Sequence, residues 1–365
     1  MHIAPISVVR LATVALVLAL VTAACGGDAV RFEYPASPSA ATASPAPTFA
    51  PTATPLPTPP GTPDPAAACT ACWPDNVPAA RPHYGLSQAD MVIEELVEGF
   101  VTRLVAIYQS QDPPTIGGVR SARLADRSIA TMVRGALVYS GTSDYAWSLI
   151  SQDATSGRYV ELSADHSGGY YRVNFRPAPY NMFTSAAAQR DTLTKIGAAT
   201  VADVPTLSFL ANADHAPSIG GMAGATAATQ ITIPYREDVS TVSYEYDAKT
   251  RTYARWQNSA GKAVRDVDAA NNVPIAAADV VIIQTDIWEV AEIVDAAGTH
   301  AHDMRLTGSG KATVFRDGLR QEATWSRKDD AAPFVFTNAQ GEQIKLTAGQ
   351  PWFHVIPTDW TVTFR

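Results

Sequence analysis

The chain has 365 residues, of which 46% are hydrophobic and 17% charged, and this length is sufficient for two globular domains. Its formal net charge of −8 at pH 7 excludes non-specific binding of nucleic acid, which requires a strongly basic surface. Any site for an anion must therefore be local.

Residues 1–24 have the pattern of a secretory signal. An apolar run from Leu11 to Val21 is followed by small residues and then by Cys25. The ending "TAAC" resembles a bacterial lipobox, in which the cysteine becomes the lipidated first residue, although Thr22 stands where Leu or Val is usual. An uncleaved N-terminal anchor is the alternative, but the run is short for a bilayer span. In both cases we expect the folded part outside the cytoplasm, at the outer face of the cytoplasmic membrane.

Residues 25–68 are predicted to form a disordered tether. Between Tyr34 and Pro65 the chain is almost wholly Pro, Ala, Thr and Ser, which cannot bury a core. Cys69 and Cys72 follow, and in an exported chain such an isolated pair is most simply a local disulfide. A redox-active thiol pair is the alternative, although such a pair normally begins a helix that follows a strand.

Residues 69–227 are predicted to form a mixed α/β domain. Apolar periodicity predicts strands at residues 91–98, 101–110 and 136–141, and helices after Gly118, from Ser143 onward and over residues 185–199. The connection to the next part is the Ala/Gly-rich stretch "SIGGMAGATAATQ".

Residues 228–365 are predicted to form a β-rich domain. Turn signals at Asp317-Gly318 and at Gly261 separate runs with alternating or continuous apolar character. The predicted strands lie in residues 230–235, 240–247, 252–257, 279–288, 311–326 and 350–357. The fold class is therefore α/β (α+β), with an N-terminal mixed α/β domain followed by a β-rich C-terminal domain.

Common catalytic signatures are absent from the sequence. "TGSGKA" around Lys311 lacks the first Gly and the final Ser/Thr of a phosphate-binding loop, and "GTSDY" at Ser143 lacks the second Gly of a nucleophile elbow. "THAHD" offers His300, His302 and Asp303, but no further cluster with ligand spacing stands near it. We therefore expect no metal and no cofactor, and the sequence assigns no catalytic residue.

The segment "TIGGVRSARLADRSIATMVRG" places arginines where a helix is predicted to begin. At 100° per residue Arg120, Arg123, Arg127 and Arg134 fall within about 60° of one another. A helix N-terminus carries partial positive charge, so two arginines there are unfavourable unless an anion lies nearby. The opposite face of this predicted helix is apolar: Ala122, Ala125, Ile129, Met132 and Val133.

Carboxylates of the chain itself are one candidate for that anion. Glu94 and Glu98 share a face if their segment is a strand, and Arg103 follows the next turn. An internal network of these three residues with Arg120 and Arg123 would satisfy every charge. The alternatives are an anionic ligand, which the preceding glycines would allow to approach closely, and plain surface charge. We favour the internal network.

Several motifs together resemble the YerB-like lipoproteins, a bacterial family of uncharacterised function. They are "RPHYGLSQADMVIEELVEGFVTRLVAIYQS", "IGGVRSAR", "ALVYSGTSDYA" and "FRPAPYNMFTS", followed by "YARW", "LTGSGKATVFRDG", "ATWSRK" and "LTAGQPWFHVIP". The chain departs from the family at Gly118, where a Pro is usual, and at Tyr139 and Tyr180, where a His is usual. The resemblance implies an α/β half and a β-rich half, with these characteristic polar positions: Glu94, Glu98, Arg103, Arg120, Ser121, Arg123 and Asn181.

A looser similarity of element order connects the chain with the LytR-CpsA-Psr enzymes, which transfer glycopolymers from pyrophosphate-linked lipids. It is an analogy at the level of the fold. We expect an envelope lipoprotein that binds or supports assembly, attached to the membrane by its lipid, with a cell-wall or envelope component as candidate partner. The alternative is an enzyme for an anionic, phosphate-containing substrate, with Arg120 and Arg123 as charge stabilisers and Glu94 or Glu98 as base or metal ligand.

Overall fold

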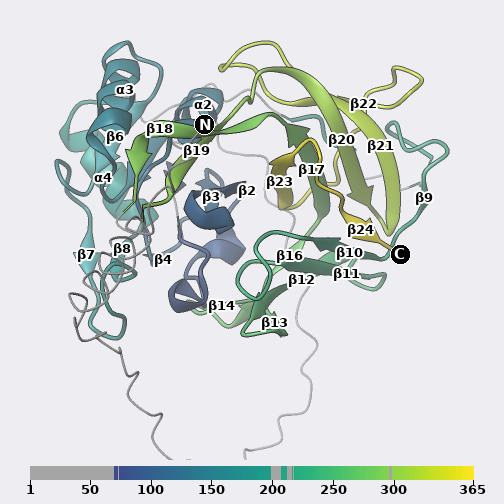
Figure 1. The fold of residues 1–365 in the computed structure, drawn as a ribbon, viewed down its shortest axis with the longest axis horizontal. Coiled ribbons are helices and arrows are strands. Elements are labelled where there is room, and N and C mark those ends of the chain that lie inside the picture. The colour runs from purple at the N-terminus through teal and green to yellow at the C-terminus, as the bar shows by residue number, and fades with distance from the viewer. Residues whose placement is uncertain (1–69, 73, 199–206, 212–215, 217, 296–297) are drawn as a thin grey trace, which may run out of the picture. The chain divides into compact units, whose positions relative to one another are not determined.

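The computed structural model describes residues 70–72, 74–198, 207–211, 216, 218–295 and 298–365, all within a compact unit that spans Pro55–Arg365 (Figure 1). The signal, the tether, Cys25 and Cys69 lie outside the described residues, so the lipidation and the disulfide remain predictions. In the described part, none of the helices combines the length and the apolar character needed to cross a membrane.

The main sheet has eleven strands and takes strands from both predicted domains. Its centre is β23, which pairs in parallel with β17 on one side and with β2 on the other. In spatial order its strands are β22 (Val335–Thr337), β21 (Leu319–Arg327), β20 (Gly308–Arg316), β17 (Asp279–Thr285), β23 (Pro351–Pro357), β2 (Met91–Leu96), β3 (Thr102–Tyr108), β1 (Thr70–Cys72), β5 (Ala136–Tyr139) and β6 (Val160–Ser163), with β9 (Thr226–Ala227) beside β21.

Strands β2 and β3 are buried on both faces of this sheet. Ile93 and Val105 belong to one apolar core, whereas Val92 and Leu104 belong to the other. Successive side chains of a strand point to opposite faces. The adjacent carboxylates Glu94 and Glu95 are therefore directed into different environments.

The described residues of the first half contain three α-helices: α2 (Leu124–Val133), α3 (Asp144–Thr155) and α4 (Ala186–Lys195). The hydroxyl of Ser143 accepts the Ala146 N–H at 3.2 Å, and Ser185 caps α4 in the same way. These caps explain why both helices begin at the predicted positions. In Figure 1, α3, α4 and β6 lie at the opposite side from β20–β22.

Helix α2 begins later than the sequence predicted. Its N-cap is Arg123, and Asp126 at the third helical position accepts the Arg123 N–H. Arg120 therefore precedes the helix, where its carbonyl accepts the N–H of Ser140 at 2.9 Å. The prediction that both arginines lie in the first helical turn is wrong, because the capping interaction of Asp126 with Arg123 makes Leu124 the first helical residue. The carboxylate of Asp126 also supplies the negative charge that a helix N-terminus favours.

The remaining elements are smaller sheets and single turns. Strand β8 pairs with both β4 and β7, and the turn of 3₁₀-helix η4 (Glu98–Phe100) joins β2 to β3. The other 3₁₀ turns are η2 (Pro78–Ala80) and η3 (Leu86–Gln88), and the three-stranded sheet consists of β4 (Ile116–Gly117), β8 (Met182–Thr184) and β7 (Tyr171–Arg172).

A second sheet of six strands lies within the second half. Its order is β13 (Lys262–Arg265), β12 (Thr252–Ser259), β11 (Val242–Asp247), β10 (Gln230–Ile233) and β24 (Thr363–Phe364), with β16 (Ala276–Ala277) beside β12. Two ribbons complete the half: β14 (Val267–Asp268) with β15 (Val273–Pro274), and β18 (Ile287–Val294) with β19 (His300–Met304). The mixed first half and the β-rich second half confirm the predicted fold class.

The stretch predicted to connect the two halves is packed against the second half. Met222 is 2% exposed, and the Gly220 carbonyl accepts the N–H of Lys345 at 2.9 Å. The predicted boundary between residues 227 and 228 thus falls between two halves that share one sheet. Whether these halves separate under proteolysis stays a prediction.

Candidate functional site

Charged side chains gather where β2, η4 and β3 meet the segment that leads into α2. We call this group the arginine cluster. It contains three cations and four carboxyl groups: Arg103, Arg120, Arg123, Asp75, Glu95, Glu98 and Asp126.

Arg120 pairs with Asp75, a partner that the sequence did not indicate. Its Nε lies 2.9 Å from Asp75 Oδ2, and the Asp75 residue is only 4% exposed. Burial raises the pKa of Asp75, but the Arg103 and Arg120 cations outweigh it and hold that pKa below its ordinary value. The Arg120 guanidinium also lies 5.3 Å from the ring centroid of Tyr180.

Arg123 forms a two-pronged pair with Glu98. Nη2 donates to Oε2 at 2.8 Å, and Nε lies 2.7 Å from Oε1, so the two charges are in direct contact. Burial raises the pKa of Glu98, but Arg123 outweighs this effect and lowers the pKa below its ordinary value. This part of the predicted network is present in the structure.

Arg103 is almost fully enclosed, at 3% exposure. Its Nη1 donates to the Ser121 carbonyl at 2.6 Å, and its Nη2 lies 4.0 Å from Asp75 Oδ2. Burial, followed by the nearby Arg123 cation, lowers the pKa of Arg103 to about 10, so it remains a cation at neutral pH.

Glu95 and Asp126 complete the cluster, and both are 0% exposed. Burial, followed by the Asp126 carboxylate, raises the pKa of Glu95 well above its ordinary value. The position of Glu95 therefore favours its protonated form. Asp75 is the shared ion-pair partner of Arg103 and Arg120, and Glu98 is the partner of Arg123.

Glu94 lies on the other face of the sheet, and the prediction that it joins Glu98 is wrong. Its Oε2 is 2.7 Å from Arg255 Nη2, and its Oε1 accepts from Asn76 at 2.8 Å and from Thr102 at 2.7 Å. Strand β2 ends at residue 96, so the alternation of faces does not continue to Glu98 in the following turn.

Arg255 is the centre of a second buried network, which joins the two halves. It is 0% exposed, pairs with Asp266 as well as Glu94, and lies 4.5 Å from the ring centroid of Trp352. The sequence signal that could have found it is its place in β12, where every second residue is buried. A charged residue at an inward position of a strand requires a buried partner.

Two buried histidines accompany these networks without charge. His354 Nε2 lies 2.9 Å from the Tyr244 hydroxyl, and burial, followed by Arg255, holds the pKa of His354 well below its ordinary value. His83 Nε2 donates to the Asp75 carbonyl at 3.0 Å, and burial lowers the pKa of His83 to about 4. Both imidazoles are therefore neutral at pH 7 and act in the packing of the networks.

The glycines before Arg120 serve close packing within the protein. A Cβ at Gly117 would collide with the ring of Phe183, and a Cβ at Gly118 would collide with the Tyr180 carbonyl. This packing accounts for the glycines without a ligand. Asn181 lies just before β8, where its Oδ1 accepts from Arg172 at 2.7 Å, and among the described residues no hydrogen bond joins Asn181 to the three arginines.

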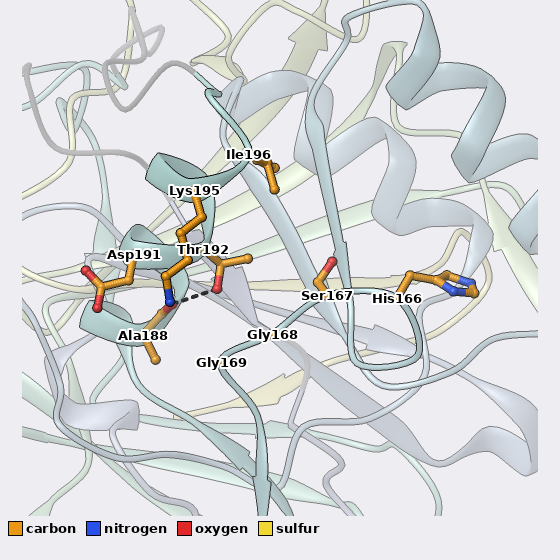
Figure 2. Close-up of a pocket in the computed structure, with 9 residues that line it drawn as sticks. All are labelled: His166, Ser167, Gly168, Gly169, Ala188, Asp191, Thr192, Lys195 and Ile196. Carbon is orange, nitrogen blue, oxygen red and sulfur yellow. Dashed lines mark hydrogen bonds between the residues drawn. The ribbon is translucent and has the colours of Figure 1, made fainter.

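None of the three arginines of the cluster lines either of two hollows in the structure. One, of about 320 Å³, lies between the loop 166–169 and α4, which supplies Ala188, Asp191, Thr192 and Lys195 (Figure 2). The other, of about 250 Å³, lies beside Arg127 and Trp288. In the described residues, no group of three or more His, Cys, Asp or Glu side chains is arranged to hold a metal ion.

The comparisons with known proteins agree with this architecture. The N-terminal domain model of the protein family of unknown function DUF3048 matches residues 54–199, and its C-terminal domain model matches residues 231–353. The chain belongs to the DUF3048 family. This membership confirms the predicted resemblance to the YerB-like lipoproteins.

The YerB protein of Bacillus subtilis is similar to this DUF3048 protein both in sequence and in structure. "Putative lipoprotein YerB" of strain 168 is 28% identical over 286 residues, which cover 78% of this chain and 79% of the relative. The crystal structure of the YerB protein has a TM-score of 0.66 and 26% identity, and the match covers 82% of this chain and 94% of that chain. The name of this relative supports a lipoprotein and states no activity.

Proposed function

We propose that the protein is a lipid-anchored extracytoplasmic module that binds an envelope component or supports an assembly, and that its arginine cluster is part of the framework. The observation that carries this proposal is the closure of Arg120 by Asp75 and of Arg123 by Glu98. A site for an anionic substrate would need cations left without internal partners. The similarity to a lipoprotein and the signal ending at Cys25 support the location.

The second candidate is an enzyme for an anionic, phosphate-containing substrate. The observation in its favour is that the Arg120 side chain keeps 20% of its surface exposed and the Arg123 side chain 15%. A phosphate group would meet arginines whose charges are already offset by Asp75 and Glu98, and it could use only the N–H groups that these carboxylates leave open. The first proposal is therefore the better supported one.

A double-mutant cycle between Arg120 and Asp75 tests the proposal. Arg120→Ala should lower the free energy of unfolding by about 3 kcal/mol, because it leaves the buried Asp75 carboxylate without its partner. Adding Asp75→Asn should recover part of this loss, with a coupling energy of about 1 to 3 kcal/mol in urea denaturation. Arg320→Ala is the control, since the Arg320–Glu322 pair lies at the surface and should contribute at most about 1 kcal/mol.

The contrary result is equally specific. If the arginines belong to a substrate site, they repel each other in the free protein. Arg120→Ala would then leave the stability unchanged or raise it, with no coupling to Asp75. That outcome would favour the enzyme over the binding module.

A further inference from the structure

A basic and aromatic surface lies on the β7–β8 hairpin of this acidic protein. Between Asp165 and Asp191 the chain contains no acidic residue, although its net charge is −8. We call the surface formed by Tyr171, Arg172, Phe175 and Arg176 of this region, together with Tyr84, which packs against Phe175, the hairpin surface. Tyr171, Arg172 and Phe175 are exposed, Tyr84 and Arg176 are half-buried, and the hairpin lies near β4 and α4 (Figure 1).

The aromatic rings of the hairpin surface are held in place from below. Phe183 is fully buried, and its ring centroid lies 5.2 Å from that of Tyr84, 5.7 Å from that of Phe175 and 6.1 Å from that of Tyr171. Phe175 is nevertheless 59% exposed and Tyr171 45% exposed. Rings that are fixed before binding lose little conformational entropy when a ligand covers them.

The two arginines of the hairpin surface are also held, but by neutral groups. Arg176 donates to the backbone carbonyls of Ala80 (2.6 Å) and Pro82, and its guanidinium lies 5.1 Å from the Tyr84 ring centroid. Arg172 donates to the amide oxygen of Asn181. Among the described residues no carboxylate forms an ion pair with either arginine, so both positive charges remain uncompensated. Arg120 and Arg123 differ in this respect.

We propose that the hairpin surface docks an anionic glycan, that is, a sugar polymer that carries carboxylate or phosphate groups. The exposed ring faces offer a flat apolar platform with a negative quadrupole, which suits the C–H face of a pyranose ring. The arginines beside them suit carboxylate or phosphate groups on the same polymer. This inference rests on the proposed function as a binding module, since it names the class of component that is bound.

The order of residues along the hairpin favours a glycan over a membrane. Arg176 lies over the Tyr84 ring, and Asn174 and Arg176 flank the exposed Phe175 in the sequence. Inserting Phe175 into a bilayer would carry these polar neighbours out of water, at a large cost. A polymer that presents apolar and anionic groups side by side can contact both kinds of side chain without this cost.

Binding of fluorescent polymers to the full lipidated chain in non-ionic detergent tests the proposal. The probes are polygalacturonate for carboxylates and a phosphomannan for phosphates, with unphosphorylated mannan as the neutral comparison. We expect at least one anionic polymer to bind and neutral mannan to bind more weakly. The double variant Phe175→Ala/Arg172→Gln should weaken that binding by about tenfold or more.

The chain offers a matched control for this double variant. Phe364 is 43% exposed and lies under the guanidinium of Arg320, at 4.0 Å, but Arg320 is paired with Glu322. Phe364→Ala/Arg320→Gln should therefore leave polymer binding within about twofold of the parent. Unchanged melting temperatures establish that both variants fold, since all four side chains lie at the surface.

Four outcomes would overturn the proposal. The first is the absence of binding to both anionic polymers, and the second is an equal loss of polymer binding in the control variant. The third is competition by polyglutamate as strong as that by the anionic glycan, which would indicate an acidic polypeptide. The fourth is equally strong competition by micelles of short-chain phosphatidylglycerol, which would indicate a membrane surface. None of them bears on the coupling between Arg120 and Asp75. A failure of the glycan proposal is thus distinguishable from a failure of the proposed function.

Discussion

The carboxyl group of Glu95 is buried between Asp126 and two arginines, and its protonation follows from that position. Burial, followed by the Asp126 carboxylate, raises the pKa of Glu95 well above its ordinary value, whereas Arg103 and Arg123 lower it by less. The folded state therefore binds this proton more tightly than the unfolded state. Stability from Glu95 is fully present below the ordinary pKa of 4.5 and is lost as the pH rises toward the folded pKa.

Glu95→Gln tests this protonation state, because glutamine has the shape of the protonated side chain. We expect the free energy of unfolding of the variant to rise relative to that of the parent as the pH increases from about 4.5 to 8. In the parent, keeping Glu95 protonated in the folded state becomes more costly as the pH rises, whereas glutamine does not titrate. Urea denaturation at several pH values measures the difference. Glu322→Gln at the surface is the control and should show no such trend. A parent that is more stable than Glu95→Gln at pH 8 would show that Glu95 is ionised.

Pairing between β2 and β23 is the element-scale feature that unites the two halves. Val92, Ile93 and Glu94 pair in register with Trp352, Phe353 and His354. Without the second half, β2 would present a bare apolar edge, and Glu94 would lose Arg255, its buried counter-ion. The first half alone is therefore an incomplete fold.

Expression of residues 69–227 alone tests this dependence. We expect a chain that aggregates or lacks a cooperative thermal transition, whereas the full chain unfolds cooperatively. Circular dichroism during heating measures the thermal transition of the fragment and that of the full chain. A soluble fragment with a sharp transition would instead show two independent domains, as the change in composition near residue 228 suggested.

Sequence periodicity could predict the elements of this protein but not their partners. Ser143 and Ser185 identify their helices because a cap is a local interaction, and Asp317-Gly318 gives the β20–β21 hairpin for the same reason. The pairing of β2 with β23 joins residues more than 250 positions apart, and a continuous apolar strand does not specify its neighbour. Asp75 and Arg255 escaped prediction because their partners are distant in the chain.

At the scale of the whole molecule, charge is distributed unevenly. The chain carries a net charge of −8, and the arginines of its cluster pair with Asp75 and Glu98, whereas the arginines of the β7–β8 hairpin have no such partner among the described residues. A small anion therefore competes with these carboxylates for the charge of the cluster. A polymer can engage the hairpin, where Arg172 and Arg176 donate hydrogen bonds to neutral groups.

Titration of the full chain with pyrophosphate, followed by its melting temperature, tests the closure of the arginine cluster most directly. Anything that binds the folded state alone raises the melting temperature, and above Kd the rise continues with the logarithm of the free ligand concentration. We predict that pyrophosphate changes the melting temperatures of the parent chain and of Arg120→Ala equally, because Asp75 and Glu98 already pair with the arginines. A concentration-dependent rise in the parent that is absent from a stably folded Arg120→Ala variant would contradict this account.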